Sequence, residues 1–195
     1  MKWPILKFRL IPITNAMTIF LILIGGAVVT GAVLYNRLVR DSNLVREAWS
    51  GIDVQLKRRH DLIPKIVQLV ASYMSYEKKT LEDVTSLRTR GQAATNLAER
   101  EEIEARLTEG IKNIFVVAEN YPELKASQSF SDLQKSITEV EDHLQMARRY
   151  YNGTVRNFNV RIASFPSFFL ARSFGFTPRD YFQAESQERE VPASA

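Results

Sequence analysis

Apolar residues recur every three or four positions along most of this chain, from Val45 to Phe165. This spacing places them on one stripe of an α-helix, as at the a and d positions of a coiled coil or helical bundle. No segment of useful length alternates apolar and polar residues with a period of two, the pattern of a half-buried strand. The spacing therefore predicts an all-α fold. The structural core predicted from the stripe includes Trp49, Ile52, Leu56 and Phe158.

Helix-breaking residues divide the stripe into segments. Gly91 is predicted to end one helix, with Asn96 as the N-cap of the next. Pro122 ends that helix, because proline disfavours the helical conformation in the residue before it. The sequence from Ser129 resembles a capping box that begins a long third helix, and Pro166 closes that helix.

Pro64 admits two interpretations. Asp61, three residues earlier, can serve as an N-cap with Pro64 in the first turn, so that a reversal at residues 59–62 gives four antiparallel helices. Alternatively, the three-to-four spacing continues through Pro64 almost unbroken, which suits one long kinked helix. The pattern of residues alone leaves both interpretations open.

A window of 27 residues between Arg9 and Arg37 carries no charge. Within it, the 20 residues from Ala16 to Tyr35 would rise about 30 Å as a helix, the thickness of the hydrocarbon core of a bilayer. This stretch is longer than the apolar region of a cleaved signal peptide, so it predicts a retained, single-pass transmembrane helix. Basic residues flank both ends equally, so the positive-inside rule leaves open the side of the membrane on which the soluble domain lies.

Composition narrows the possible function classes. The 195 residues include 0 Cys, which excludes disulfides, thiol nucleophiles and cysteine zinc sites. The net charge of +4 comes mostly from the first 36 residues, and the remainder holds 23 Lys+Arg against 22 Asp+Glu. A nucleic-acid-binding domain concentrates positive charge on its folded part, so no nucleic-acid partner is expected. Glu139 and His143 do not form the paired Glu-x-x-His motifs of a bundle metal site, so no metal or other cofactor is expected.

Several long segments of the sequence are similar to the LemA family. They are N-L-V-R-E-A-W-S-G-I-D-V-Q-L-K-R-R-H-D-L-I-P-K-I-V (Asn43–Val67), E-N-Y-P-E-L-K (Glu119–Lys125), A-R-R-Y-Y-N-G-T-V-R-N-F-N (Ala147–Asn159), F-P-S (Phe165–Ser167) and G-F-T-P-R-D-Y-F (Gly175–Phe182). Gly51, Lys65 and Gly153 depart from the residues usual in the family. The resemblance implies a single-pass bacterial membrane protein with an antiparallel up-and-down four-helix bundle, and hence a chain reversal near Pro64.

The resemblance carries no biochemical activity to this chain. A related protein of magnetosome-forming bacteria takes part in membrane biogenesis, which favours a membrane-organising role by analogy. The pattern and the resemblance together predict three parts: residues 1–36 form a basic arm and the transmembrane helix, residues 37–183 a LemA-like helical bundle, and residues 184–195 a polar, disordered tail.

Two clusters of residues are candidate binding sites. The basic cluster Lys57, Arg58, Arg59 and His60 lies where the chain would reverse. We interpret it first as a structural helix corner and second as a surface for an anionic protein partner. Residues 165–182 hold seven of the chain's 20 aromatic residues, which must be covered by the bundle, a second subunit or lipid. The candidate contacts for assembly or lipid are Phe168, Phe169, Phe174 and Phe176.

These features predict a non-enzymatic, membrane-anchored helical scaffold or interaction protein of the bacterial envelope that self-assembles and organises membrane. An enzyme is disfavoured because the apolar stripes supply almost no inward-pointing polar residues. An accessory or sensor subunit of an envelope stress or membrane-proteolysis system is the alternative, because it would share every one of these features. The predicted location is the bacterial cell membrane, and the predicted partners are the lipid bilayer, further copies of the chain and an unidentified envelope protein.

Overall fold

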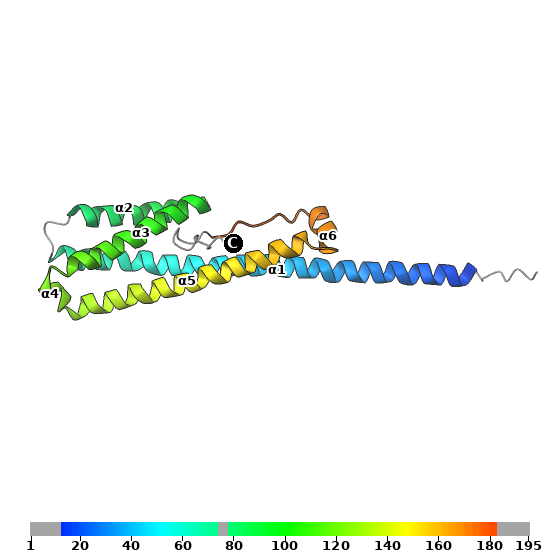
Figure 1. Cartoon of the computed structure of the whole chain (residues 1–195), viewed down its shortest axis with the longest axis horizontal. Helices are drawn as coiled ribbons and strands as arrows, with labels where there is room; N and C mark the ends of the chain where they lie inside the picture. Colours follow the sequence, from blue (N-terminus) through cyan, green and yellow to red (C-terminus); the bar gives the residue numbers. More distant parts are fainter. Residues whose placement is uncertain (1–12, 74–77, 183–195) are drawn as a thin grey trace, which may run out of the picture. The chain divides into compact units, whose positions relative to one another are not determined.

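The computed structural model describes residues 13–73 and 78–182, and every regular element in these ranges is a helix (Figure 1). The predicted all-α class is therefore confirmed. The predicted tail at residues 184–195 and the basic residues of the N-terminal arm lie outside the described residues. The long helices are α1 (Ile13–Ala71), α2 (Lys78–Ala93), α3 (Leu97–Ala118) and α5 (Gln128–Ala163), and the short ones are α4 (Pro122–Lys125) and α6 (Ser167–Ser173).

Helix α1 continues through Pro64 to Ala71, so the reversal at residues 59–62 that the family resemblance implied is wrong. Proline lacks the N–H that would bond the carbonyl oxygen of His60, four positions earlier. The Nε of Arg88, in α2, donates to that carbonyl at 2.7 Å instead. A neighbouring helix thus satisfies the acceptor that Pro64 leaves open.

The remaining helix boundaries follow the predictions in some places and differ in others. Asn96 caps α3 as predicted, because its side chain accepts a 3.0 Å hydrogen bond from the backbone N–H of Ala98. Pro122 occupies the first turn of α4, where its missing N–H has no cost. Gly91 does not end α2, which continues beyond it, and Ser129 lies within α5 rather than at its N-cap.

The chain divides into two compact units. The anchor unit consists of the residues up to 42 together with 158–178, and the core unit consists of residues 43–157 together with those from 179 onward. Both α1 and α5 contribute to each unit. Residues 158–178 therefore group with the part of α1 that contains the apolar stretch.

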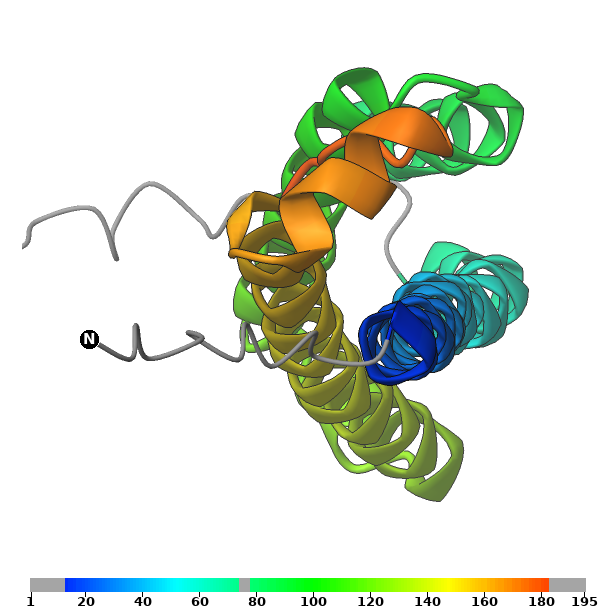
Figure 2. The same cartoon turned by 90° about the vertical axis from the view of Figure 1, so that its right-hand side faces the viewer.

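The core unit buries one apolar cluster to which five helices contribute, and α2 and α3 lie side by side in both views (Figures 1 and 2). The cluster includes Ile63 and Ile66 of α1, Val84 of α2, Leu107 of α3, Leu124 of α4 and Ile137 of α5. Ile52 and Leu56 are also buried in this unit, and Phe158 is buried in the anchor unit, whereas Trp49 is only half-buried.

Candidate functional site

The aromatic segment, residues 165–176, begins just after α5 ends and contains α6. Gly175 follows α6 with φ of 73°, a left-handed conformation that glycine adopts without strain. This glycine lets the N–H of Phe176 bond the carbonyl of Ala171 at 2.9 Å, the hydrogen bond of a Schellman motif. The motif ends α6 and turns Phe176 back towards the helix.

Aromatic contacts hold this segment against α1. The ring of Tyr35, at the end of the apolar stretch of α1, lies 4.8 Å from the ring centroid of Phe174 and 6.2 Å from that of Phe176. Phe176 also packs at 6.3 Å from the buried Phe158 of α5. An ion pair between Arg161 and Asp41 joins α5 to α1 in the same unit. The segment therefore has a defined place beside the end of the apolar stretch.

Most phenylalanines of the aromatic segment remain exposed although their backbone is fixed. The exposed fraction is 82% for Phe165, 41% for Phe168, 62% for Phe169 and 60% for Phe174. Phe176 is half-buried, so of the four predicted contacts it is the one that packs inward. The apolar side chains of α1 between Met17 and Val33 are exposed as well. The anchor unit thus presents apolar side chains both on the candidate membrane helix and on the segment beside its end.

The predicted basic cluster at residues 57–60 is divided by its position on α1. Lys57 and Arg58 are exposed. Arg59 and His60 are buried, with 0% and 5% of their surface exposed. Their side chains point into the core unit, so a partner on the surface of this unit meets only the first two residues.

Arg59 is the centre of a buried polar network that joins three helices. Its guanidinium pairs with the carboxylate of Glu104 in α3, which is also fully buried. The same guanidinium donates to the hydroxyl of Thr108 at 2.7 Å and to Glu141 of α5 at 2.6 Å. The second carboxylate oxygen of Glu104 lies 2.9 Å from the Nε2 of His60. Both oxygens of this carboxylate are therefore occupied by groups of the chain itself.

Burial and nearby positive charges keep the imidazole of His60 neutral. Burial, followed by the positive charges of Arg59 and Arg88, lowers the pKa of His60 from 6.5 to about 4. The neutral ring can then donate its Nε2–H to the Oε1 of Glu104. A Cβ at Gly91 would lie 2.7 Å from the Oε1 of Glu104, so this glycine serves to bring α2 close to the network.

The sequence prediction missed this network, although a signal for it existed. Arg59 occupies the position of the apolar stripe between Leu56 and Ile63. Glu104 likewise stands on the stripe that continues with Leu107 and Ile111. One basic and one acidic residue on two otherwise apolar stripes indicate a buried ion pair.

The last four described residues, Arg179–Phe182, form a strap on the core unit. The side-chain amide of Asn152 donates to the carbonyl of Phe182 and accepts from its N–H, both at 2.8 Å. The hydroxyl of Tyr151 donates to the carbonyl of Asp180 at 3.0 Å. Burial and the nearby Asp180 carboxylate raise the pKa of this hydroxyl, which stays protonated as a donor. The strap is therefore held by its backbone.

The ring of Phe182 is enclosed by the half-buried Trp49 and by a basic side chain. Its centroid lies 6.3 Å from the ring of Trp49 and 4.7 Å from the guanidinium carbon of Arg148. Trp49 in turn packs on Tyr151 at 5.4 Å and beneath Arg100 at 5.7 Å. The predicted core tryptophan thus belongs to an aromatic and cationic box that receives Phe182.

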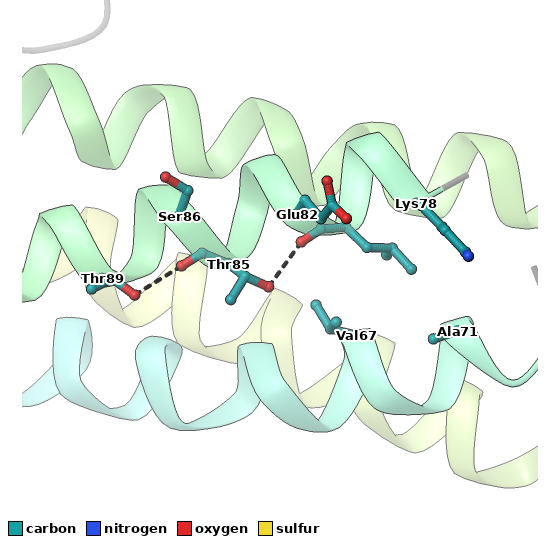
Figure 3. Close-up of a pocket in the computed structure, with 8 residues that line it drawn as sticks. Val67, Ala71, Lys78, Glu82, Thr85, Ser86 and Thr89 are labelled. Carbon is teal, nitrogen blue, oxygen red and sulfur yellow. Dashed lines mark hydrogen bonds between the residues drawn. The ribbon is translucent and has the colours of Figure 1, made fainter. Parts of the chain in front are cut away.

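A groove of about 490 Å³ lies between α1 and α2 of the core unit (Figure 3). Val67 and Ala71 line one side, and Thr85 and Thr89 line the other. Both threonine hydroxyls donate to backbone carbonyls of their own helix, at 2.8 and 3.1 Å. These two donors are therefore already used, and Lys78, Glu82 and Ser86 supply the other polar side chains of the lining. Among the described residues, no three His, Cys, Asp or Glu side chains gather as metal ligands.

Comparisons with known proteins agree with one another on the relationship. The model of the LemA family matches residues 48–194. The chain is 27% identical over 155 residues to Protein LemA of Metamycoplasma hominis, covering 79% of this chain and 71% of that protein. It is 22% identical over 198 residues to Magnetosome protein MamQ 2 of Paramagnetospirillum magneticum, covering 88% and 73% of the two chains. Magnetosome protein MamQ of Magnetospirillum gryphiswaldense is 20% identical over 197 residues, covering 88% and 72%.

Proposed function

Because this chain belongs to the LemA family, we propose that it is a single-pass membrane-anchored helical interaction protein of the bacterial envelope, without enzymatic activity. Its soluble part would act through contacts with lipid and protein. The two relatives named magnetosome proteins support a membrane-organising role by analogy. The buried Arg59–Glu104 network supports the non-enzymatic part of the proposal, because both oxygens of the buried Glu104 carboxylate already bond Arg59 and His60.

The membrane anchor of this proposal is the N-terminal part of α1. Among the described residues, α1 is the one helix long and apolar enough to cross a membrane, and its most apolar window is not buried at all. In water, such a continuous exposed apolar surface would be a strong aggregation site. A lipid bilayer covers it without a second protein.

The observation that carries the proposal is the contact of Tyr35 with the aromatic segment. Tyrosine at the end of an apolar span is typical of the membrane–water interface. Phe174 lies 4.8 Å from this tyrosine, so an anchor that ends at Tyr35 brings the aromatic segment to the depth of the headgroups. The exposed Phe168 and Phe169 would then contact lipid rather than water.

The proposed soluble architecture is an antiparallel up-and-down four-helix bundle made of the second half of α1 with α2, α3 and α5. The shared apolar cluster and the Arg59 network support it, because each draws on several of these helices. Self-association of further copies, and binding of an envelope protein at Lys57 and Arg58, belong to the same proposal. They are tested by crosslinking in native membranes, with Lys57→Gln and Arg58→Gln as the paired change.

Lipid contact by the aromatic segment can be tested directly because the chain has 0 Cys. A Phe169→Cys variant of the whole chain is labelled with the fluorophore NBD and reconstituted into phosphatidylcholine vesicles. We expect doxyl-labelled phosphatidylcholine to quench it strongly. The matched control is a label at Val116→Cys, which is 64% exposed on α3 of the core unit and should be quenched much less. Equal, weak quenching at both sites would refute the membrane contact.

The competing explanation is that a second copy of the chain covers the same phenylalanines. A variant with Phe168→Ser and Phe169→Ser separates the two, because these exposed side chains contribute little to folding. We expect the variant to keep its helix content and its size in detergent. If it dissociates into smaller particles instead, the segment is a protein interface.

A further inference from the structure

The charges of the anchor unit are almost all positive. Its charged side chains among the described residues are Arg37, Arg40, Asp41, Arg161 and Arg172. The one acid, Asp41, is buried and paired with Arg161. The three other arginines are exposed. The unit therefore presents three positive charges that no carboxylate of the unit neutralises.

These three arginines flank the aromatic contact on both of its helices. Arg37 and Arg40 follow Tyr35 on α1, about 3 and 8 Å further along the helix axis. These rises do not exceed the Debye length of about 8 Å at physiological salt. Arg172 lies on α6 between the exposed Phe169 and Phe174, and the latter touches Tyr35. Positive charge and exposed aromatic rings thus occur together at one end of the apolar stretch.

We propose that this end of the anchor unit binds anionic phospholipids, with Arg37, Arg40 and Arg172 at the headgroup phosphates and the exposed phenylalanines among the upper acyl chains. The proposal rests on the membrane contact proposed above and adds the lipid class. A zwitterionic headgroup leaves each guanidinium beside a neutral surface, whereas an anionic leaflet attracts it. Arginine suits this role because its planar fork of donors matches the oxygens of a phosphate.

The expected size of the preference follows from the number of arginines. One basic residue near an anionic surface contributes about a fivefold preference, so three give an upper limit of about a hundredfold. Salt lowers this value because the charges are exposed. We expect a measured preference of about fivefold or more in low salt that declines steadily as salt is added.

The test uses the whole chain labelled with NBD at Phe169→Cys in phosphatidylcholine vesicles. Equal mole fractions of doxyl-phosphatidylglycerol or doxyl-phosphatidylcholine are added, and their quenching is compared. The triple change Arg37→Gln, Arg40→Gln and Arg172→Gln should remove the difference between the two lipids while quenching by doxyl-phosphatidylcholine persists. The matched control changes three exposed basic residues of the core unit by the same net charge: Arg90→Gln, Arg106→Gln and Lys112→Gln.

Each outcome decides between the two proposals. Stronger quenching by phosphatidylglycerol, lost in the anchor variant and kept in the control, supports the anionic-lipid site. Equal quenching by both lipids overturns this inference and leaves the membrane contact standing. Weak quenching by both lipids refutes the membrane contact itself. If the control variant loses the preference as completely as the anchor variant, the attraction is a property of net charge and the site is refuted.

Discussion

Replacing Arg59 by methionine is the sharpest test of how the core unit is held together. Methionine approaches the length of arginine but carries no charge, so Arg59→Met leaves the Glu104 carboxylate in the interior without its guanidinium. In the wild type that guanidinium bonds Glu104, Thr108 and Glu141, and neither Arg59 nor Glu104 reaches solvent. Removing one partner of such a buried ion pair destabilises a protein by about 3–5 kcal/mol. We expect a loss of this size.

Removing both charges should be less harmful than removing one. A buried ion pair replaced by apolar residues of similar volume is often neutral in stability, because two desolvation costs disappear together with the attraction. The double variant Arg59→Met, Glu104→Met should therefore be more stable than Arg59→Met alone. The double-mutant cycle isolates this coupling between α1 and α3.

The pH dependence of stability provides an independent readout with a definite sign. In the wild type the pKa of His60 is lowered from 6.5 to about 4, so below pH 6.5 the unfolded chain binds this proton more readily than the folded one. This contribution to stability is complete above pH 6.5 and is lost as the pH falls towards 4. The full shift corresponds to about 3 kcal/mol. Because His60 borders an open pocket lined by Lys57 and Arg100, we expect solvent screening to reduce this to about 1–2 kcal/mol.

Protonation of His60 should have the opposite effect on stability in Arg59→Met. Without Arg59, the imidazole faces an unpaired Glu104 carboxylate and loses its nearest positive charge, so its pKa should rise. Protonation then supplies the missing cation, and Arg59→Met should gain stability relative to the wild type as the pH falls from 7 to about 5. His60→Gln, which cannot titrate, should remove the effect.

The measurement is urea and thermal unfolding followed by circular dichroism. It uses a chain truncated to begin at Arg40, which we expect to be soluble and helical without the apolar stretch of α1. A loss of about 3–5 kcal/mol corresponds to a melting temperature lower by about 6–20 °C in a domain of this size. Arg58→Met, on the exposed neighbour, is the matched control and should change stability by less than about 0.5 kcal/mol. Equal effects of the two variants, or an unchanged pH profile in Arg59→Met, would show that the network does not stabilise the fold.

Further substitutions test other parts of the structure by the same unfolding measurement, with the whole chain in detergent for the anchor unit. Gly91→Ala should destabilise by about 1–3 kcal/mol because its Cβ meets the buried carboxylate, whereas Gly51→Ala meets nothing and should stabilise by up to about 1 kcal/mol. Phe158→Ala should destabilise by about 3–5 kcal/mol because the ring is buried. Trp49→Ala should destabilise by less because Trp49 is only half-buried, and a larger loss for Trp49→Ala than for Phe158→Ala would contradict this burial. Gly175→Ala should cost about 1–2 kcal/mol because its φ is positive, and no change would mean that this turn is not required.

Local patterns allowed the helices to be predicted. Ile52, Leu56 and Ile63 lie within about three helical turns, so a single chain segment is enough to reveal their spacing. The cap at Asn96 is equally local, because its partner is the N–H two residues on. The uncharged window before Arg37 indicates a membrane helix by length alone. Each of these signals is complete within one continuous segment of the chain.

Features that depend on a distant partner could not be predicted in the same way. Pro64 lies within α1 because Arg88, 24 residues later, satisfies the carbonyl of His60. Gly91 has the sequence signature of a helix end, yet its function is to admit the carboxylate of Glu104 from α3. Arg59 looked like part of an exposed basic run because its neighbours in sequence are basic, whereas its position on the stripe agrees with its burial. At Arg59 the spacing of the apolar stripe therefore predicted burial better than the composition of the neighbouring residues did.

The aromatic segment differs from a free C-terminal tail because both of its ends are fixed. Helix α5 leads into it, and the strap that follows is held in the core unit by the side chain of Asn152 on the backbone of Phe182. A segment tethered in this way has fewer conformations to lose when it meets a bilayer, so more of its apolar contact contributes to binding. Seven aromatic residues within residues 165–182 then serve two different needs. In the anchor unit Phe176 packs on the buried Phe158 while Phe168 and Phe169 stay exposed, and in the core unit Phe182 packs on Trp49.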